Sequence, residues 1–256
     1  MTHPAFDLTG KAALITGGNS GIGLGMAEGV AKAGADVCIW GTNETKNAAA
    51  LKQLERHGRR AVAFQCDVGD EQAVEKTFAA TVSALGRVDA CFANAGVPPL
   101  APSFAQMTSE EWRRVLRVNL DGAFFTFRSA VRHMVERGGG GSLVATSSLS
   151  AMEGQARGQH YASTKGGLVS MVKAIAVEYA RNGIRANAIV PGWIETGMTS
   201  PIFNMDRFRE KVLPRVPLRR WGTGADFEGI AVYLVSDASA YHTGDVFIID
   251  GGYAIF

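Results

Sequence analysis

Tyr161 and Lys165 are the residues whose types and spacing first suggest chemistry. They lie four residues apart in a stretch of helical character, so both side chains project from one face of the expected helix. A phenol that gives up or takes a proton while a hydride moves would interconvert a carbonyl and an alcohol. The spacing Tyr-x-x-x-Lys is common by itself, so this interpretation depends on the rest of the chain.

A free phenol is too weak an acid for this task, because its pKa is about 10. Lowering that pKa to about 7 requires roughly 4 kcal/mol of preference for the phenolate. An ammonium about 4 Å away, at an effective dielectric constant of about 20, supplies an energy of this order. We therefore expect Lys165 to acidify Tyr161, and an oxidised nicotinamide to add to the effect.

Two further residues complete the expected catalytic group. Ser148 follows a strand-like run, thirteen residues before Tyr161, where its hydroxyl could hydrogen-bond the substrate oxygen as charge develops. Asn119 interrupts a predicted helix and could hold a water molecule that links Lys165 to solvent. The alternative is that Tyr161 and Lys165 are ordinary surface residues of a helix.

Short apolar runs alternate with longer helical stretches along the chain. The runs are nearly continuous in apolar residues, which is typical of parallel strands buried on both faces and joined by crossover helices. The pattern predicts one α/β domain over residues 1–256, a doubly wound sheet of seven parallel strands with helices on both faces. The expected strands are 12–16, 37–40, 61–66, 88–93, 142–146, 186–190 and 246–249.

Other local patterns mark the boundaries of elements. Thr108 with Glu111, and Thr223 with Asp226, have the spacing of capping boxes that open helices. Residues 196–217 break the alternation, because three prolines stand there among large apolar side chains. This segment is predicted to be an inserted substrate lid, with an ordinary surface excursion as the alternative.

A glycine-rich turn lies between the first predicted strand and the first predicted helix. Gly17, Gly21 and Gly23 allow a tight turn, and they let backbone N–H groups and the helix N-terminus approach a pyrophosphate. Asp67 ends the third strand, where its carboxylate could accept from an adenine amino group. Asn94 ends the fourth strand, beside the point where strand order reverses. A cap or turn role is the alternative for both residues.

Composition excludes several other classes of function. A formal net charge of +2 provides no basic field for nucleic acid. Cys38, Cys66 and Cys91 have the spacing of neither a metal site nor a disulfide framework, so we expect buried, reduced thiols in a cytoplasmic protein. Residues 1–17 lack the features of a signal peptide, and no apolar run is long enough to span a membrane.

Taken in this order, the motifs resemble those of the short-chain dehydrogenase/reductase family, from about Leu8 to Tyr253. The resemblance implies an NAD(P)-dependent oxidoreductase with strand order 3-2-1-4-5-6-7, assembled as a homotetramer or homodimer. It implies catalytic roles for Asn119, Ser148, Tyr161 and Lys165. The implied cofactor contacts are Gly17, Asn19, Ser20, Gly21, Ile22, Gly23, Thr42, Asn43, Asp67, Val68, Asn94, Ala95, Gly96, Tyr161, Lys165, Pro191, Gly192, Ile194 and Thr196. In the motif Ala93-Asn94-Ala95-Gly96, Ala93 replaces a frequent asparagine.

Residues at the end of the second predicted strand bear on the choice between NADP and NAD. An acidic residue there would accept from the adenosine ribose and repel a 2′-phosphate, but the position is Gly41. Thr42 stands where many NADP enzymes carry arginine, and Ser20 lacks the basic side chain often found in the glycine turn. Thr42, Asn43 and Lys46 could bind a phosphate weakly. The sequence therefore favours NADP without excluding NAD.

The substrate is less clearly marked. The expected pocket residues are mostly apolar, which favours a hydrophobic or acyl substrate. Core packing is the alternative for each of them. They are Ser150, Gln155, Trp193, Met198 and Phe203, with Met152, Met205, Pro98 and Pro99 nearby. A general ketone reductase is the first expectation, a 3-oxoacyl reductase of fatty-acid type the second, and a polyol or sugar dehydrogenase the third. The non-enzymatic alternative is a dinucleotide-binding sensor or scaffold.

Two further groups of residues bear on substrate binding and catalysis. The arginines Arg128, Arg132 and Arg181 could dock an acidic acyl carrier or simply form a solvated face. His160 is expected to be structural, because adjacent residues on a helix point in different directions.

Overall fold

A seven-stranded parallel sheet with order β3-β2-β1-β4-β5-β6-β7 organises the chain, as predicted. The computed structural model describes residues 3–256. Strand order reverses between β1 and β4, so their carboxyl ends form the crevice where such sheets bind ligands. The strands are β1 (Ala12–Thr16), β2 (Asp36–Gly41), β3 (Ala61–Gln65), β4 (Ala90–Ala93), β5 (Gly141–Thr146), β6 (Ile184–Pro191) and β7 (Val246–Ile249).

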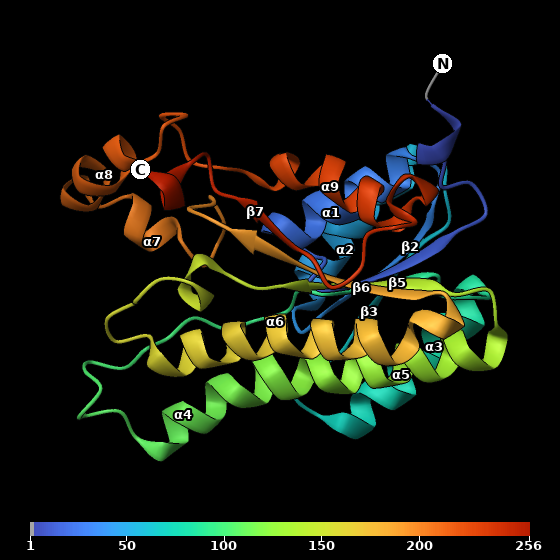
Figure 1. Cartoon of the computed structure of the whole chain (residues 1–256), viewed down its shortest axis with the longest axis horizontal. Helices are drawn as coiled ribbons and strands as arrows, with labels where there is room; N and C mark the ends of the chain where they lie inside the picture. Colours follow the sequence, from blue (N-terminus) through green and yellow to red (C-terminus); the bar gives the residue numbers. More distant parts are fainter. Residues whose placement is uncertain (1–2) are drawn as a thin grey trace.

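Helices cover both faces of the sheet (Figure 1). One layer contains α1 (Gly21–Lys32), α2 (Glu44–Leu54) and α9 (Glu228–Val235), and the other contains α3 (Glu71–Leu85), α5 (Gly122–Arg137) and α6 (Gln159–Tyr179). The shorter helices are α4 (Ser109–Leu116), α7 (Ser200–Phe203) and α8 (Asp206–Val212).

The apolar strand runs form two cores, one on each face of the sheet. Every residue of β1 and β4 is buried, whereas the edge strands β3 and β7 are only partly buried. Central strands are covered by helices on both faces, which explains why their sequences contain almost no polar side chains. Five strands differ from their predicted bounds. β4 begins at Ala90 rather than Val88, and β3 stops at Gln65, one residue before Cys66. β2, β5 and β6 are instead longer than predicted, by one or two residues at one or both ends.

α4, a π-helical turn η3 (Arg117–Asp121) and α5 form one continuous helix. The turn explains why Asn119 interrupts the helical pattern. Thr108 caps this helix by accepting from the Glu111 amide at 3.1 Å. The predicted capping box at Thr108 is only half correct, because the Glu111 side chain turns to Leu100 and other partners instead. The second predicted box, Thr223 with Asp226, is confirmed.

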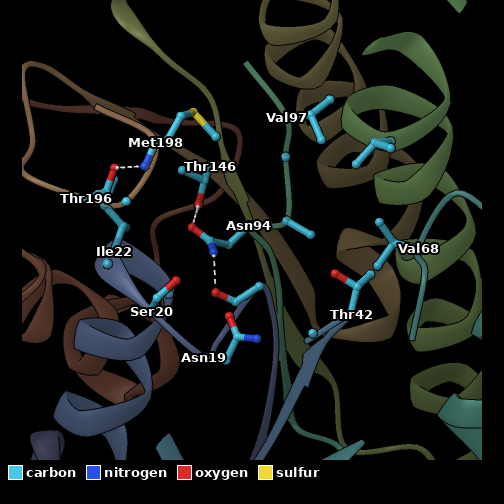
Figure 2. Close-up of a pocket in the computed structure, with 18 of the residues that line it drawn as sticks. Asn19, Ser20, Ile22, Thr42, Val68, Asn94, Val97, Thr146, Thr196 and Met198 are labelled. Carbon is cyan, nitrogen blue, oxygen red and sulfur yellow. Dashed lines mark hydrogen bonds between the residues drawn. The ribbon is translucent and has the colours of Figure 1, made fainter. Parts of the chain in front are cut away.

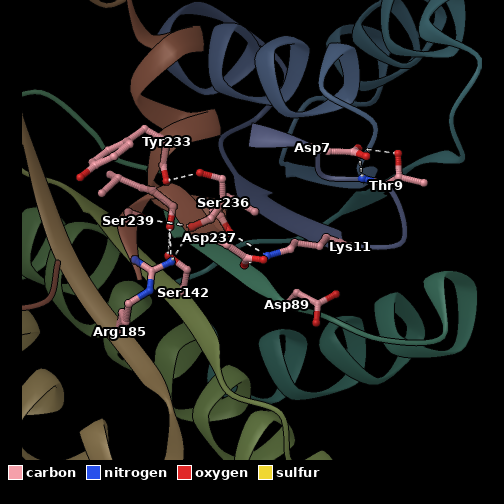
Figure 3. Close-up of polar contacts among 12 residues, drawn as sticks. Asp7, Thr9, Lys11, Asp89, Ser142, Arg185, Tyr233, Ser236, Asp237 and Ser239 are labelled. Carbon is pink, nitrogen blue, oxygen red and sulfur yellow. Dashed lines mark hydrogen bonds and ion pairs between the residues drawn. The ribbon is translucent and has the colours of Figure 1, made fainter. Parts of the chain in front are cut away.

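Polar contacts at the amino ends of the strands fasten the end of α9 to the sheet (Figure 3). Ser142 Oγ of β5 and Arg185 Nη2 of β6 both donate to the main-chain oxygen of Leu234, at 2.7 and 2.8 Å. Lys11, just before β1, pairs with Asp237 at 2.6 Å. This edge is structural and leaves the carboxyl edge open for the site.

Candidate active site

A cleft of about 490 Å³ runs along the carboxyl ends of the strands. Every residue that the sequence predicts to contact the cofactor lines this cleft, from Gly17 of the glycine turn to Thr196 after β6. Of the predicted catalytic residues, Ser148, Tyr161 and Lys165 line it as well. Figure 2 shows that residues at the start of α1 and after β2, β4 and β6 point into this cleft.

The glycine turn requires residues without side chains. Gly17 has a φ of +63°, and a Cβ on Gly23 would lie 2.2 Å from the Gly17 oxygen. Ser20, the N-cap of α1, forms no side-chain capping bond. The first N–H groups of α1 therefore keep no side-chain partner at the cleft wall and can bind an anion. These residues fit the pyrophosphate of a dinucleotide.

Asn94 holds the glycine turn against the neighbouring strands (Figure 2). Its Nδ2 donates to the main-chain oxygens of Thr16 and Gly17 at 3.0 and 3.2 Å, and its Oδ1 accepts from Thr146 Oγ1 at 3.1 Å. Both ends of the amide are thus bonded within the protein. Asn94 therefore fixes the glycine turn to β4 and β5.

Gly41 faces two asparagine side chains that fill the end of β2. Asn19 Nδ2 donates to Asn47 Oδ1 at 2.7 Å, and Asn47 Nδ2 donates to the Gly41 and Phe64 oxygens. A Cβ at Gly41 would come within 2.1 Å of Asn19 Nδ2. A side chain at the position that could carry an acidic ribose ligand would therefore have to displace the ends of Asn19 and Asn47. Sequence reasoning missed Asn47, which lies within helix α2.

Asp67 is held on both of its carboxylate oxygens. Oδ1 accepts from the Gly69 amide at 2.9 Å, and Oδ2 pairs with Arg117 Nη1 at 2.9 Å. Arg117 belongs to the π-helical turn and lines the same cleft. Sequence reasoning missed Arg117, because its partner lies fifty residues earlier in the chain.

The end of β5 and the first turns of α6 bring the catalytic candidates together. Lys165 is 4% exposed, donates through Nζ to the Thr146 oxygen at 2.7 Å, and lies 5.5 Å from the centroid of the Tyr161 ring. Ser147 ties the two elements by donating to the Lys165 oxygen at 2.8 Å. Ser148 caps the short helix that follows β5.

The two titratable groups are shifted by burial. Burial raises the pKa of the Tyr161 phenol, and the Ser148 hydroxyl opposes this rise. Burial lowers the pKa of Lys165 to about 8. Burial therefore opposes the acidification of Tyr161 that Lys165 and an oxidised nicotinamide are expected to cause. Desolvation disfavours both charged forms, and the Lys165 ammonium is directed to a carbonyl oxygen.

Asn119 is buried within η3, and its side-chain amide both accepts from and donates to the main chain of Val97. Its Oδ1 accepts from the Val97 amide at 2.8 Å, and its Nδ2 donates to the Val97 oxygen at 3.0 Å. Asn119 does not line the cleft itself, whereas Val97 does. The bridging water predicted for Asn119 stays a prediction.

The expected substrate residues are placed unevenly. Met198 lines the cleft, with its amide bonded to Thr196 Oγ1 (Figure 2). Ser150 and Gln155 bond to each other at 2.5 Å outside the cleft lining. Trp193 and Phe203 also lie outside it and pack with aromatic neighbours. Their contact with substrate stays a prediction.

The segment predicted as a lid contains α7 and α8. Phe203 at the end of α7 stacks on Trp221 with ring centroids 4.3 Å apart, and Phe208 of α8 packs against Trp193 at 5.1 Å. This aromatic cluster fixes the two helices to the segments before and after them. Residues 196–217 therefore share a small aromatic core with the segments that flank them.

Three further features of the described chain concern its cysteines, its metal-binding groups and its helices. The three cysteines are free and buried, as predicted. Among residues 3–256, no group of histidine, cysteine or acidic side chains could hold a metal ion. No helix in the part of the chain that the structure describes is both long and apolar enough to cross a membrane.

Comparisons with known proteins agree with this geometry. The family model described as enoyl-(acyl carrier protein) reductase matches residues 17–254. The chain belongs to the short-chain dehydrogenase/reductase family. This oxidoreductase is 38% identical to L-rhamnose 1-dehydrogenase (NAD(P)(+)) of Sphingomonas sp. (strain SKA58), over 96% of each chain. It is also 38% identical to 2-dehydro-3-deoxy-D-gluconate 5-dehydrogenase of Bacillus subtilis (strain 168), over 98% of this chain and 97% of that one.

A solved structure supports the same conclusion. Gluconate 5-dehydrogenase from Burkholderia cenocepacia J2315, in complex with NADP and tartrate, superposes with a TM-score of 0.93. The two chains are 32% identical, and the match covers 99% of this chain and 100% of the other.

Proposed function

We propose that this NAD(P)-dependent oxidoreductase interconverts a secondary alcohol and a ketone, with Tyr161 as the general acid or base. The observation that carries the proposal is that Tyr161, Lys165 and Ser148 line the same cleft as the glycine turn. A bound nicotinamide would supply or accept the hydride. In reduction, Tyr161 Oη donates its proton to the substrate oxygen, and Ser148 hydrogen-bonds the same oxygen. The Lys165 ammonium stabilises the phenolate that remains.

The preferred cofactor in this proposal is NADP. Residue 41 is a glycine, so the end of β2 carries no carboxylate that would repel a 2′-phosphate. The cationic side chains of Lys46 and Arg117 line the adenosine end of the cleft and would attract that phosphate. A related gluconate 5-dehydrogenase is described with NADP bound, which supports the same choice.

The proposed substrate is a neutral polyhydroxy compound such as a sugar. The relatives named above are named for sugars or sugar acids. Among residues 3–256, the only cationic side chains that line the cleft besides Lys165 are Lys46 and Arg117, and Arg117 pairs with Asp67. A sugar acid or an acyl carrier would need a further cationic side chain. Arg128 and Arg132, the candidate docking residues for an acyl carrier, pair instead with Glu71 and Glu75.

The test is a substrate panel read by the absorbance of reduced nicotinamide. It contains a neutral aldose or polyol, an aldonate and a 3-oxoacyl thioester, each with NADP(H) and NAD(H). We expect turnover with the neutral compound, and we expect Tyr161→Phe to lower it by at least about 100-fold while cofactor affinity is retained. Turnover of wild-type rate in Tyr161→Phe would refute the assigned role. Faster turnover of the thioester would favour the 3-oxoacyl reductase.

We also propose a quaternary structure and a compartment for the protein. The family resemblance supports a homotetramer or homodimer, and light scattering in solution would decide between them. Three free, buried thiols are compatible with a reducing compartment such as the cytoplasm.

A further inference from the structure

Side chains of the continuous α4–η3–α5 helix hold the main chain of residues 97–100, which we term the wall segment. Asn119 binds the amide and the carbonyl of Val97. Arg114 Nη2 donates to the Pro98 oxygen at 2.7 Å. Val97 lines the cleft, and a Cβ on the neighbouring Gly96 would lie 3.8 Å from Lys165 Nζ, so the wall segment borders the part of the cleft that contains Lys165.

Glu111 is the centre of this attachment. Its Oε1 accepts from the Leu100 amide at 2.9 Å, and its carboxylate pairs with Arg114 at 2.7 and 3.0 Å. The same Oε1 is 3.0 Å from His160 Nε2. The Arg114 guanidinium lowers the pKa of Glu111 to about 2, so the carboxylate is ionised at neutral pH.

His160 is completely buried and immediately precedes Tyr161 in the first turn of α6. The contact with an ionised carboxylate requires the proton on Nε2, which donates to Glu111. The other ring nitrogen, Nδ1, is buried without a partner in the described structure. A buried polar atom without a partner is unfavourable, so an apolar residue would fill this space better. What histidine provides at residue 160, and an apolar residue would not, is the hydrogen bond to Glu111.

We propose that Glu111 is a positioning residue that sets the distance between the wall segment and Tyr161. One carboxylate binds the Leu100 amide on one side and His160, next to Tyr161, on the other. A substrate held between Val97 and Tyr161 would thereby have its reacting carbon and oxygen oriented toward the phenol and the nicotinamide. This inference rests on the proposed reaction at Tyr161.

The kinetic test compares Glu111→Ala, Glu111→Gln and Thr108→Ala. We expect Glu111→Ala to raise the KM for the carbonyl or alcohol substrate by about 10-fold or more, with unchanged cofactor Kd. Glu111→Gln restores part of the loss, because an amide oxygen still accepts from Leu100 and His160. Thr108→Ala removes the N-cap of the same helix and lowers the Tm without a change in KM. Equal KM in Glu111→Ala and Thr108→Ala would overturn the proposal.

An exchange measurement tests the coupling without turnover. We expect the Leu100 amide to exchange hydrogen faster in Glu111→Ala and in His160→Leu than in Thr108→Ala. Unchanged exchange in His160→Leu would show that α6 does not help to hold the wall segment, and would overturn the proposal. If the wild-type protein converts no compound of the panel, the proposed function fails, while the exchange result still decides the coupling.

Discussion

Gly41 lies against the side chain of Asn19, so that a Cβ at residue 41 would be 2.1 Å from Asn19 Nδ2. Introducing an acidic residue at this strand end is the obvious way to favour NAD. We expect Gly41→Asp instead to weaken binding of both NADPH and NADH by about tenfold or more, because Asn19 and the glycine turn must move. Fluorescence titration of each reduced cofactor measures this.

The control for Gly41→Asp is the double variant that also carries Asn19→Gly. Removing the asparagine side chain relieves the closest contact, so we expect NADH binding to recover at least partly. Were Gly41→Asp alone to bind NADH as tightly as the wild type does, the steric argument would be wrong.

Arg117 is expected to support the adenosine end of the cofactor. Its bond to Asp67 Oδ2 fixes a carboxylate at the cleft wall. We expect Arg117→Ala to raise the Kd of NADPH and NADH by about tenfold, with little change in kcat. Reduced nicotinamide mononucleotide, which lacks the adenosine, should bind equally well to both forms. Arg113→Ala, at an exposed position one turn earlier on α4, is the matched control; a similar loss there would point to helix stability instead.

Lys165 makes the free energy of unfolding of the protein depend on pH. Its pKa in the folded state, about 8, lies below the ordinary 10.5. Between these values the folded protein holds fewer protons than the unfolded chain, so the free energy of unfolding rises with pH. Relative to Lys165→Met, the wild type should gain about 3 kcal/mol between pH 7 and pH 10.5.

Urea unfolding at several pH values measures the Lys165 effect, since the buried thiols contribute to both proteins alike. Lys173→Met removes an exposed lysine from the same helix and serves as the control. A constant difference between the wild type and Lys165→Met across the range would contradict the shift.

Phe203 should control the opening of residues 196–217. It is 6% exposed and stacks on Trp221. We expect Phe203→Ala to lower the stability of this segment by about 3 kcal/mol, which limited proteolysis between α7 and α8 would detect as faster cleavage. Ile202→Ala, at the adjacent and 42% exposed position, should leave cleavage nearly unchanged. Cleavage that is equally fast in both variants would show that the stacking does not hold the segment.

The features that sequence predicted best are those encoded by neighbouring residues. The strand runs, the glycine turn and the Tyr161–Lys165 spacing are local patterns, and each lies where it was expected. Asn47 and Arg117 were missed because their partners, Asn19 and Asp67, lie far away in the chain. No local pattern reports such contacts between separate βα units.

Two site properties depend on packing that sequence does not reveal. The pKa of Tyr161 is governed by burial, which depends on the whole α6–sheet interface. Trp193 and Phe203 were expected in the pocket because large apolar residues beside a binding motif suggest one. Trp221, eighteen residues after Phe203, instead completes an aromatic cluster with them.

The π-helical turn at Arg117–Asp121 also determines the direction in which the side chains of α4 point relative to those of α5. One residue fewer there would restore regular α-helical geometry and rotate everything before it by about 100° relative to α5. Glu111 and Arg114 would then face away from residues 97–100, although no residue in contact with substrate had changed. A natural relative that lacks this single extra residue would need another means of holding that side of its binding site.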